Sequence, residues 1–129
     1  MLSIQRKNLL VGVNRARDQG NLSVLEQMHL PRIECPDRVG ADEAFTITVT
    51  VGSPQSHPCS DRHFIERVNI YADETLLASV LPRAKSSPPR ARVRVSLRRD
   101  VEEIRVQATC NLHGTWETSR EISVDTGEE

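Results

Sequence analysis

The strongest constraint on the fold of this chain is a two-residue period in hydrophobicity that returns in three separate segments. Residues 43–51 read EAFTITVTV, residues 90–97 read RARVRVSL, and residues 103–110 read EIRVQATC. Such alternation, rich in β-branched residues, is typical of antiparallel strands with one buried face. We therefore expect these strands to point the following side chains into a core: Phe45, Ile47, Val49, Val51, Ala91, Val93, Val95, Leu97, Ile104, Val106, Ala108 and Cys110.

Less regular strands are predicted near residues 32–35, 64–72, 75–82 and 117–124. Turn-forming stretches such as PDRVGAD, GSPQSHP and SSPP separate them. About seven short strands without an intervening helix predict an all-β fold, an immunoglobulin-like antiparallel β-sandwich. The Cys-Trp-Cys core of antibody domains is missing, so the prediction concerns the architecture alone.

The N-terminal segment, residues 1–26, has no sustained period. Its SVLE stretch, Ser23 to Glu26, has the spacing of a capping box, which predicts a short helix beginning there. We therefore divide the chain into an irregular or short helical N-terminal segment of unknown role, residues 1–26, and an immunoglobulin-like domain over residues 27–129.

Charge and apolar runs exclude several classes of protein. The 17 basic and 18 acidic residues give a net charge of −1, which argues against a nucleic-acid partner. No apolar run approaches the ~20 residues that span a bilayer, so no membrane role is expected. The apolar stretch near the N-terminus is too short for a secretory signal. Three cysteines, an odd number, fit a reducing compartment, and we expect a cytoplasmic protein.

The stretch CNLHGTW places Cys110 and His113 three residues apart, with Gly114 available for a tight turn. A thiolate and an imidazole both suit transition metals, so the pair could bind one ion. The alternative is a buried structural cysteine beside a loop histidine. Each of the other histidines, taken alone, is more often an ordinary side chain than a ligand.

Three stretches together resemble one family. CNLHGTWE, residues 110–117, resembles the iron-binding motif C-N-x-H-G-x-W-E of the superoxide reductases, the neelaredoxin and desulfoferrodoxin family. HPCSDRHFI, residues 57–65, is similar to the family's H-P-x-x-x-x-H-x-I, and HLPRIE, residues 29–34, to its H-V-P-x-I-E. The resemblance runs from about residue 27 to residue 124, and all four histidines of the chain fall on ligand positions.

The resemblance implies one mononuclear non-haem iron per chain. Four imidazoles, from His29, His57, His63 and His113, would surround the ion, and the Cys110 thiolate would bind axially, opposite an open position. The implied activity is that of a superoxide reductase, which reduces superoxide by one electron to hydrogen peroxide. An external donor such as a rubredoxin-type protein would supply the electrons, and the chain would form a homodimer or homotetramer.

The chain departs from the family directly before the first histidine. Many members carry a Glu-Lys pair there, whereas this chain has Gln27 and Met28, which carry no charge. In many members the glutamate of this pair can occupy the sixth coordination position of the oxidised iron. Glu26 lies one residue too early in the chain to match it, although a mobile loop could bring its carboxylate there. Arg32 or Arg62 could supply positive potential, but arginine is a poor proton donor. We therefore expect a competent iron site with weaker steering or slower protonation.

Two other functions stay open. The missing lysine leaves room for a non-enzymatic iron module, an electron carrier or a sensor. A structural zinc site is a further alternative, although five candidate donors exceed the four that such a site uses. Only Cys35 and Cys59 remain beside Cys110, too few for the rubredoxin-like centre of two-iron members, so the chain resembles the single-centre class. These two cysteines are interpreted as ordinary small side chains; the alternative is a role in redox damage or in binding the wrong metal.

Overall fold

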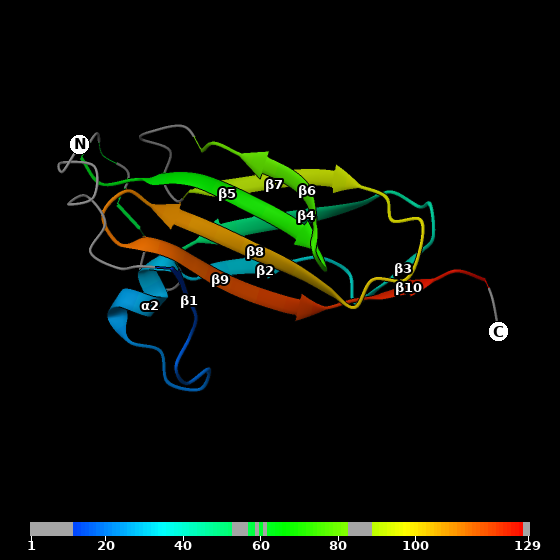
Figure 1. Ribbon diagram of the computed structural model, residues 1–129, viewed down its shortest axis with the longest axis horizontal. Helices are drawn as coiled ribbons and strands as arrows, with labels where there is room; N and C mark the ends of the chain where they lie inside the picture. The colour runs from blue at the N-terminus through cyan, green and yellow to red at the C-terminus, as the bar shows by residue number, and fades with distance from the viewer. Residues whose placement is uncertain (1–11, 53–56, 59, 61, 83–88, 128–129) are drawn as a thin grey trace.

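Two β-sheets packed face to face make up the body of the protein (Figure 1). The computed structural model describes residues 12–52, 57–58, 60, 62–82 and 89–127. One sheet has the strand order β1-β9-β8-β5-β6 and the other the order β2-β4-β7, while β3 and β10 form a two-stranded ribbon. The elements are β1 (Val13–Asn14), α2 (Val24–His29), β2 (Pro31–Glu34), β3 (Arg38–Gly40), β4 (Phe45–Val51), β5 (Ile65–Ala72), β6 (Thr75–Val80), β7 (Arg90–Val95), β8 (Glu103–Cys110), β9 (Gly114–Glu121) and β10 (Ser123–Asp125).

The alternating segments form the predicted strands, and the all-β sandwich is confirmed. Strands β4 and β8 alternate buried with half-buried residues along their whole length. β4 pairs with β7 in antiparallel register, Phe45 opposite Val95 and Val49 opposite Ala91. The predicted core side chains are buried, apart from the half-buried Val93 and Val95. The two-residue period therefore set both the strands and the face that each strand turns inward.

Three short strands differ from the prediction. β3 lies within the stretch expected as a turn and pairs in parallel with β10, with Val39 opposite Val124. The strand expected near 117–124 instead begins at Gly114 and breaks at Ile122, between β9 and β10. β1 pairs in parallel with β9. Val39 and Val124 are buried, so this ribbon extends the core although a three-residue strand shows no period.

The predicted helix start at Ser23 is confirmed. The Ser23 hydroxyl accepts a hydrogen bond from Glu26 N at 3.1 Å, and the Glu26 carboxylate accepts one from Ser23 N at 2.8 Å. This reciprocal capping box begins α2. The helix ends at His29, and Pro31 opens β2 directly after it. A histidine is thus fixed at the end of a short, well-capped helix. The division of the chain at residue 26 stays a prediction.

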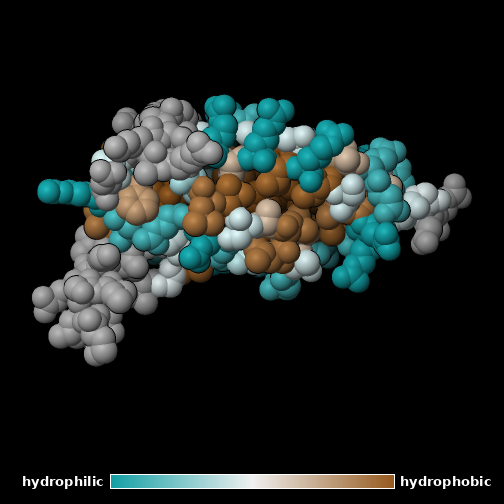
Figure 2. All heavy atoms as spheres, turned by 90° about the horizontal axis from the view of Figure 1, so that it is seen from above, coloured by the Kyte–Doolittle hydropathy of each residue, from teal (hydrophilic) through white to brown (hydrophobic). Residues whose placement is uncertain are grey.

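The edge strands β6 and β7 border an open side of the sandwich. Figure 2 views the molecule from this side and shows hydrophobic side chains gathered in a band, with hydrophilic ones beside it. Leu76 on β6 is 52% exposed and Leu81 just after it is 71% exposed. In the described part of the chain, no helix is both long and apolar enough to cross a membrane.

Candidate metal centre

The candidate site lies at the end of the sandwich where β8 turns into β9. Cys110 is the last residue of β8 and pairs with Gly114, the first residue of β9. Gly114 has φ of 79°, a left-handed conformation that a glycine adopts without strain, so the predicted tight turn is present. His113 lies within this turn, which places an imidazole next to the buried Cys110 thiol.

Two further segments bring three histidines to the same point. His29 ends helix α2, and His57 and His63 precede β5. One ligand atom from each of these histidines and the Cys110 sulfur all lie within 4.8 Å of one another. The His113 ring lies 4.9 Å from the His29 ring and 5.0 Å from the His63 ring, centroid to centroid. Its Nδ1 is 3.8 Å from the Cys110 sulfur. The structure therefore gathers all five side chains that the sequence singled out.

Hydrogen bonds on the far side of two rings leave their Nε2 atoms facing the cluster. His29 Nδ1 lies 2.7 Å from the carbonyl oxygen of Leu25, and His57 Nδ1 lies 2.7 Å from that of Pro58. A carbonyl accepts only, so each Nδ1 donates and each Nε2 keeps a lone pair. His57 Nε2 lies 3.3 Å from the Cys110 sulfur. This pattern is the one that metal-binding histidines use to fix their tautomer.

Two nitrogen atoms of the cluster are buried without a hydrogen-bond partner among the described residues. They are His29 Nε2 and His63 Nε2. Leaving a buried polar atom unsatisfied typically costs about 1–3 kcal/mol, so such an atom calls for an explanation. A metal ion between the rings would satisfy both lone pairs at once. The donor set, nitrogen and sulfur, suits a transition metal rather than calcium or magnesium.

Three imidazoles of the cluster are held neutral, as metal binding requires. Burial, together with neighbouring imidazoles, lowers the pKa of His57 to about 4 despite its bond to Pro58. Burial also lowers the pKa values of His29 and His63. Protonation at neutral pH therefore does not compete with a metal ion for these lone pairs.

The Cys110 sulfur has a mixed environment. Burial raises the pKa of the thiol, while hydrogen bonds from the backbone N–H groups of Leu112 and His113 oppose that rise. The Asn111 N–H donates to Phe64 O, at 3.2 Å. A divalent cation at the site would favour the thiolate.

Two residues of the CNLHGTWE stretch have structural roles that the sequence did not reveal. Trp116 is 5% exposed, and its indole N–H donates to the carbonyl of His113 at 3.0 Å. The buried Glu117 carboxylate binds Arg15 through one oxygen and accepts hydrogen bonds from Arg105 and Gln107 through the other, at 2.7 and 2.8 Å. Glu117 thus joins β8 and β9 to the segment that follows β1.

The candidate steering residues are placed as follows. The Glu26 carboxylate accepts hydrogen bonds from the backbone N–H groups of Ser23 and Arg17, which lower its pKa. It is therefore engaged in fixing the start of α2. Arg32 and Arg62 have exposed side chains, on β2 and directly before His63 respectively.

Cys35 is not part of the cluster. Cys35 is half-buried, and burial raises the pKa of its thiol, which makes it a weak nucleophile. Cys59 lies outside the described residues.

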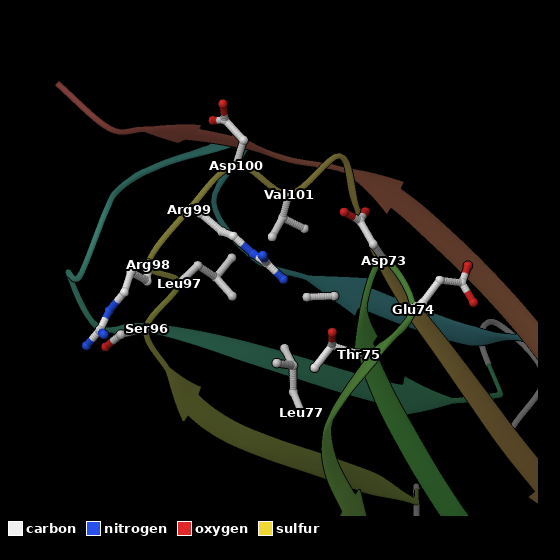
Figure 3. A pocket seen from close by; sticks show the side chains of 11 residues that line it. Asp73, Glu74, Thr75, Leu77, Ser96, Leu97, Arg98, Arg99, Asp100 and Val101 are labelled. Atoms are coloured by element: carbon white, nitrogen blue, oxygen red, sulfur yellow. The ribbon is translucent and has the colours of Figure 1, made fainter. Parts of the chain in front are cut away.

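A separate cavity of about 480 Å³ lies at the opposite end of the sandwich (Figure 3). Leu77, Leu97 and Val101 point into it, whereas Asp100 points away. It adjoins the ends of β5 and β8 remote from Cys110, about 20 Å away at the rise of an extended strand. The cavity is therefore separate from the histidine cluster.

Comparison with known proteins identifies relatives along most of the chain. The family model described as Desulfoferrodoxin matches residues 21–119. A protein of Methanocaldococcus jannaschii, whose name gives superoxide reductase as a provisional function, is 33% identical over 117 residues, 88% of this chain and 96% of that protein. Neelaredoxin of Megalodesulfovibrio gigas is 25% identical over 115 residues, 76% of this chain and 88% of that protein.

Solved structures agree in fold. A variant of the superoxide reductase (neelaredoxin) from Ignicoccus hospitalis superposes with a TM-score of 0.74 at 27% identity, covering 88% of this chain and 94% of that one. The superoxide reductase from Nanoarchaeum equitans gives a TM-score of 0.63 at 26% identity, covering 74% of this chain and 94% of that one.

Proposed function

This chain belongs to the desulfoferrodoxin family, and we propose on that basis that it is a superoxide reductase. The reaction adds one electron and two protons to superoxide and yields hydrogen peroxide. The observation that carries the proposal is the convergence of three imidazoles and one thiol on one point. Two of the imidazole nitrogens, His29 Nε2 and His63 Nε2, are buried without a hydrogen-bond partner among the described residues. A fourth imidazole, that of His113, lies beside them.

The residues present fit a single iron ion. His29, His57, His63, His113 and Cys110 would hold it, four neutral nitrogens and one anionic sulfur. When bound, iron supplies the one-electron redox chemistry that the protein side chains lack. The imidazoles of His29, His57 and His63 bring no charge, because burial lowers their pKa values and keeps them unprotonated. The thiolate offsets part of the charge of a divalent ion, and the N–H groups of Leu112 and His113 stabilise its negative charge.

The surroundings of the site support weak steering of the substrate. Superoxide is an anion, and exposed cationic side chains near a site raise its local concentration. Gln27 uses its side-chain amide to bind the Leu22 carbonyl at 3.0 Å, and Met28 carries no charge. Arg62, next to His63 in sequence, is the cation that we assign to steering, with Arg32 as a second. Protons would come from solvent.

A specific observation also favours an alternative, a non-enzymatic electron-transfer or sensor module. The residues directly before His29 carry neither the lysine nor the glutamate that many family members have there. The carboxylate of Glu26 is engaged by Ser23 and Arg17. Slow protonation at such a site would favour simple electron exchange over turnover.

The test is superoxide decay after pulse radiolysis of the anaerobic ferrous protein. A reductase consumes superoxide at a rate proportional to protein concentration and forms one peroxide per superoxide, and a reduced rubredoxin restores the ferrous state for further cycles. Cys110→Ser is expected to abolish the reaction, whereas Cys35→Ser, which removes a thiol outside the cluster, keeps it. Decay no faster than in buffer, with iron bound, would instead support the electron-transfer or sensor module. Metal analysis and the visible ferric–thiolate absorption separate both from a structural zinc site.

The assembly and compartment form part of the same proposal. The hydrophobic band of Figure 2, with the exposed Leu76 on edge strand β6, supports a homodimer or homotetramer packed through sheet edges. We place the protein in the cytoplasm, where free thiols persist. Sedimentation equilibrium of the wild type and of Leu76→Lys measures the assembly, and a monomeric wild type would contradict it.

A further inference from the structure

We propose that Asn111 is a positioning residue for His63, because its side-chain amide fixes the backbone on both sides of that histidine. The amide oxygen accepts a hydrogen bond from Phe64 N at 2.9 Å, and the amide nitrogen donates to the carbonyl of Arg62 at 2.9 Å. The two hydrogen bonds fix the backbone of the residues immediately before and after His63. The inference rests on the proposed metal site and not on any reaction with superoxide.

The backbone of Asn111 adds a third bond to the same segment. Its N–H donates to Phe64 O at 3.2 Å, one step beyond the pair that Ile65 forms with Cys110 at the end of the β5–β8 ladder. The side-chain amide therefore continues the hydrogen bonding between β5 and β8 beyond the last residue pair of the two strands, at the point where the chain turns from β8 toward β9. In this way Asn111 couples the turn that carries Cys110 and His113 to the loop that carries His63.

His63 depends on these Asn111 hydrogen bonds more than His29 and His57 do. The His29 and His57 rings are each oriented by a carbonyl oxygen 2.7 Å from Nδ1. No such bond to the His63 ring is found in the part of the chain that the structure describes, and its Nε2 is buried without a partner there. The His63 backbone is held by Ser60, whose hydroxyl accepts from His63 N at 3.1 Å, and by the Asn111 amide on either side. The orientation of the His63 ring then depends on the position of the His63 backbone.

Loss of the Asn111 amide is expected to release one donor and spare the others. Cys110 is anchored by its ladder pairs with Ile65 and Gly114, and His29 by helix α2. The site would change from five donors to four. Because structural zinc prefers four donors, Asn111 would also favour iron over zinc. Removing a group that orients a metal ligand typically weakens metal affinity by roughly 10–100-fold.

The test uses cobalt(II) as the probe, with no superoxide present. Asn111→Ala is expected to bind cobalt roughly 10–100-fold more weakly in chelator competition. It should keep the thiolate-to-cobalt absorption and gain more intense ligand-field bands, as four-coordinate cobalt does. Zinc affinity should fall less than cobalt affinity. Asn69→Ala is the control, since the Asn69 amide oxygen on β5 accepts a hydrogen bond from the Ser79 hydroxyl on β6 and touches no residue of the cluster. This variant should bind cobalt like the wild type.

A double-mutant cycle with His63→Ala separates positioning from general stability. If Asn111 acts through His63, the double variant binds cobalt no more weakly than His63→Ala alone. Additive losses, or an Asn111→Ala protein with wild-type affinity and spectrum, would overturn the proposal. If Asn111→Ala does not fold, Asn111→Asp, which keeps the acceptor for Phe64 N–H, takes its place in the cycle. A wild type that binds cobalt and iron but ignores superoxide would defeat the proposed function and leave this inference standing.

Discussion

The indole of Trp116 stacks on the imidazole of His29, with ring centroids 5.4 Å apart and planes inclined by 28°. The contact joins strand β9 to the end of helix α2, two elements that are distant in sequence. It places the only tryptophan of the protein beside a proposed metal ligand.

Tryptophan fluorescence should therefore report metal binding. We expect emission to fall as ferrous iron or cobalt(II) is added anaerobically and to level off at one equivalent, because an open-shell ion held by His29 quenches the stacked indole. A chelator should restore the signal. Unchanged emission, while metal analysis shows one bound ion, would place the ion away from His29.

The pair Gln27 and Met28 should limit the rate with superoxide. Met28→Lys is expected to raise the second-order rate about 3- to 10-fold at low ionic strength, with the gain shrinking as salt screens the added charge. Ser123→Lys adds the same charge on β10, at the other end of the sandwich, and should change the rate little. Equal gains from both variants would mean that net charge alone sets the rate.

Glu26 should not bind the metal in the oxidised protein. Its carboxylate is engaged by Ser23 and Arg17, so Glu26→Gln is expected to leave the ferric visible spectrum and its pH dependence unchanged. The same variant should lower the melting temperature, because it weakens the cap of α2. A shifted charge-transfer band in Glu26→Gln would show that the carboxylate leaves the cap and reaches the iron.

Glu117 should stabilise the fold strongly. Burial raises the pKa of this carboxyl, but hydrogen bonds from Gln107, Arg105 and Arg15 outweigh burial and leave the pKa below its ordinary value. Glu117→Gln is expected to lower the free energy of unfolding by about 2–3 kcal/mol. This is less than the roughly 3–5 kcal/mol typical of a broken buried pair, because Arg15 is largely exposed. Chemical denaturation measures this loss, with Glu121→Gln, exposed on the same strand, as the control.

The pH dependence of that contribution has a definite sign. A carboxyl with a lowered folded-state pKa stabilises the protein fully above its unfolded-state pKa. The stabilisation is lost as the pH falls through the folded-state value. The stability difference between wild type and Glu117→Gln should therefore shrink on acidification and stay constant from neutral pH upward. A difference that grows in acid would contradict the assignment.

Much of the sandwich was predictable because its main strands are long enough to show a period. The alternation over 45–51 and 103–110 identified β4 and β8 with their buried faces. By contrast, β1 and β3 have two and three residues, and both pair in parallel with strands far along the chain. Local pattern carries no information about such partners, so these strands were missed.

The candidate site was predictable in its members but not in its supports. A thiol and an imidazole three residues apart suggested metal binding, and family motifs added the remaining histidines. What holds them in place depends on neighbours distant in sequence. The Asn111 amide lies across residues 62 and 64, and the Glu117 carboxylate meets Arg15 from the N-terminal segment. Neither contact could be predicted from the spacing of residues within a short stretch of sequence.

The histidines and the cysteine of the cluster come from three separate parts of the chain, which only the finished sandwich brings together. The unfolded chain therefore has a much lower affinity for the ion, and metal binding shifts the folding equilibrium toward the native state. Free metal at a hundred times its dissociation constant would add about 2.7 kcal/mol to the unfolding free energy. In a cell starved of iron, we expect this protein to open more often and to be degraded faster, so that its abundance follows the supply of the metal.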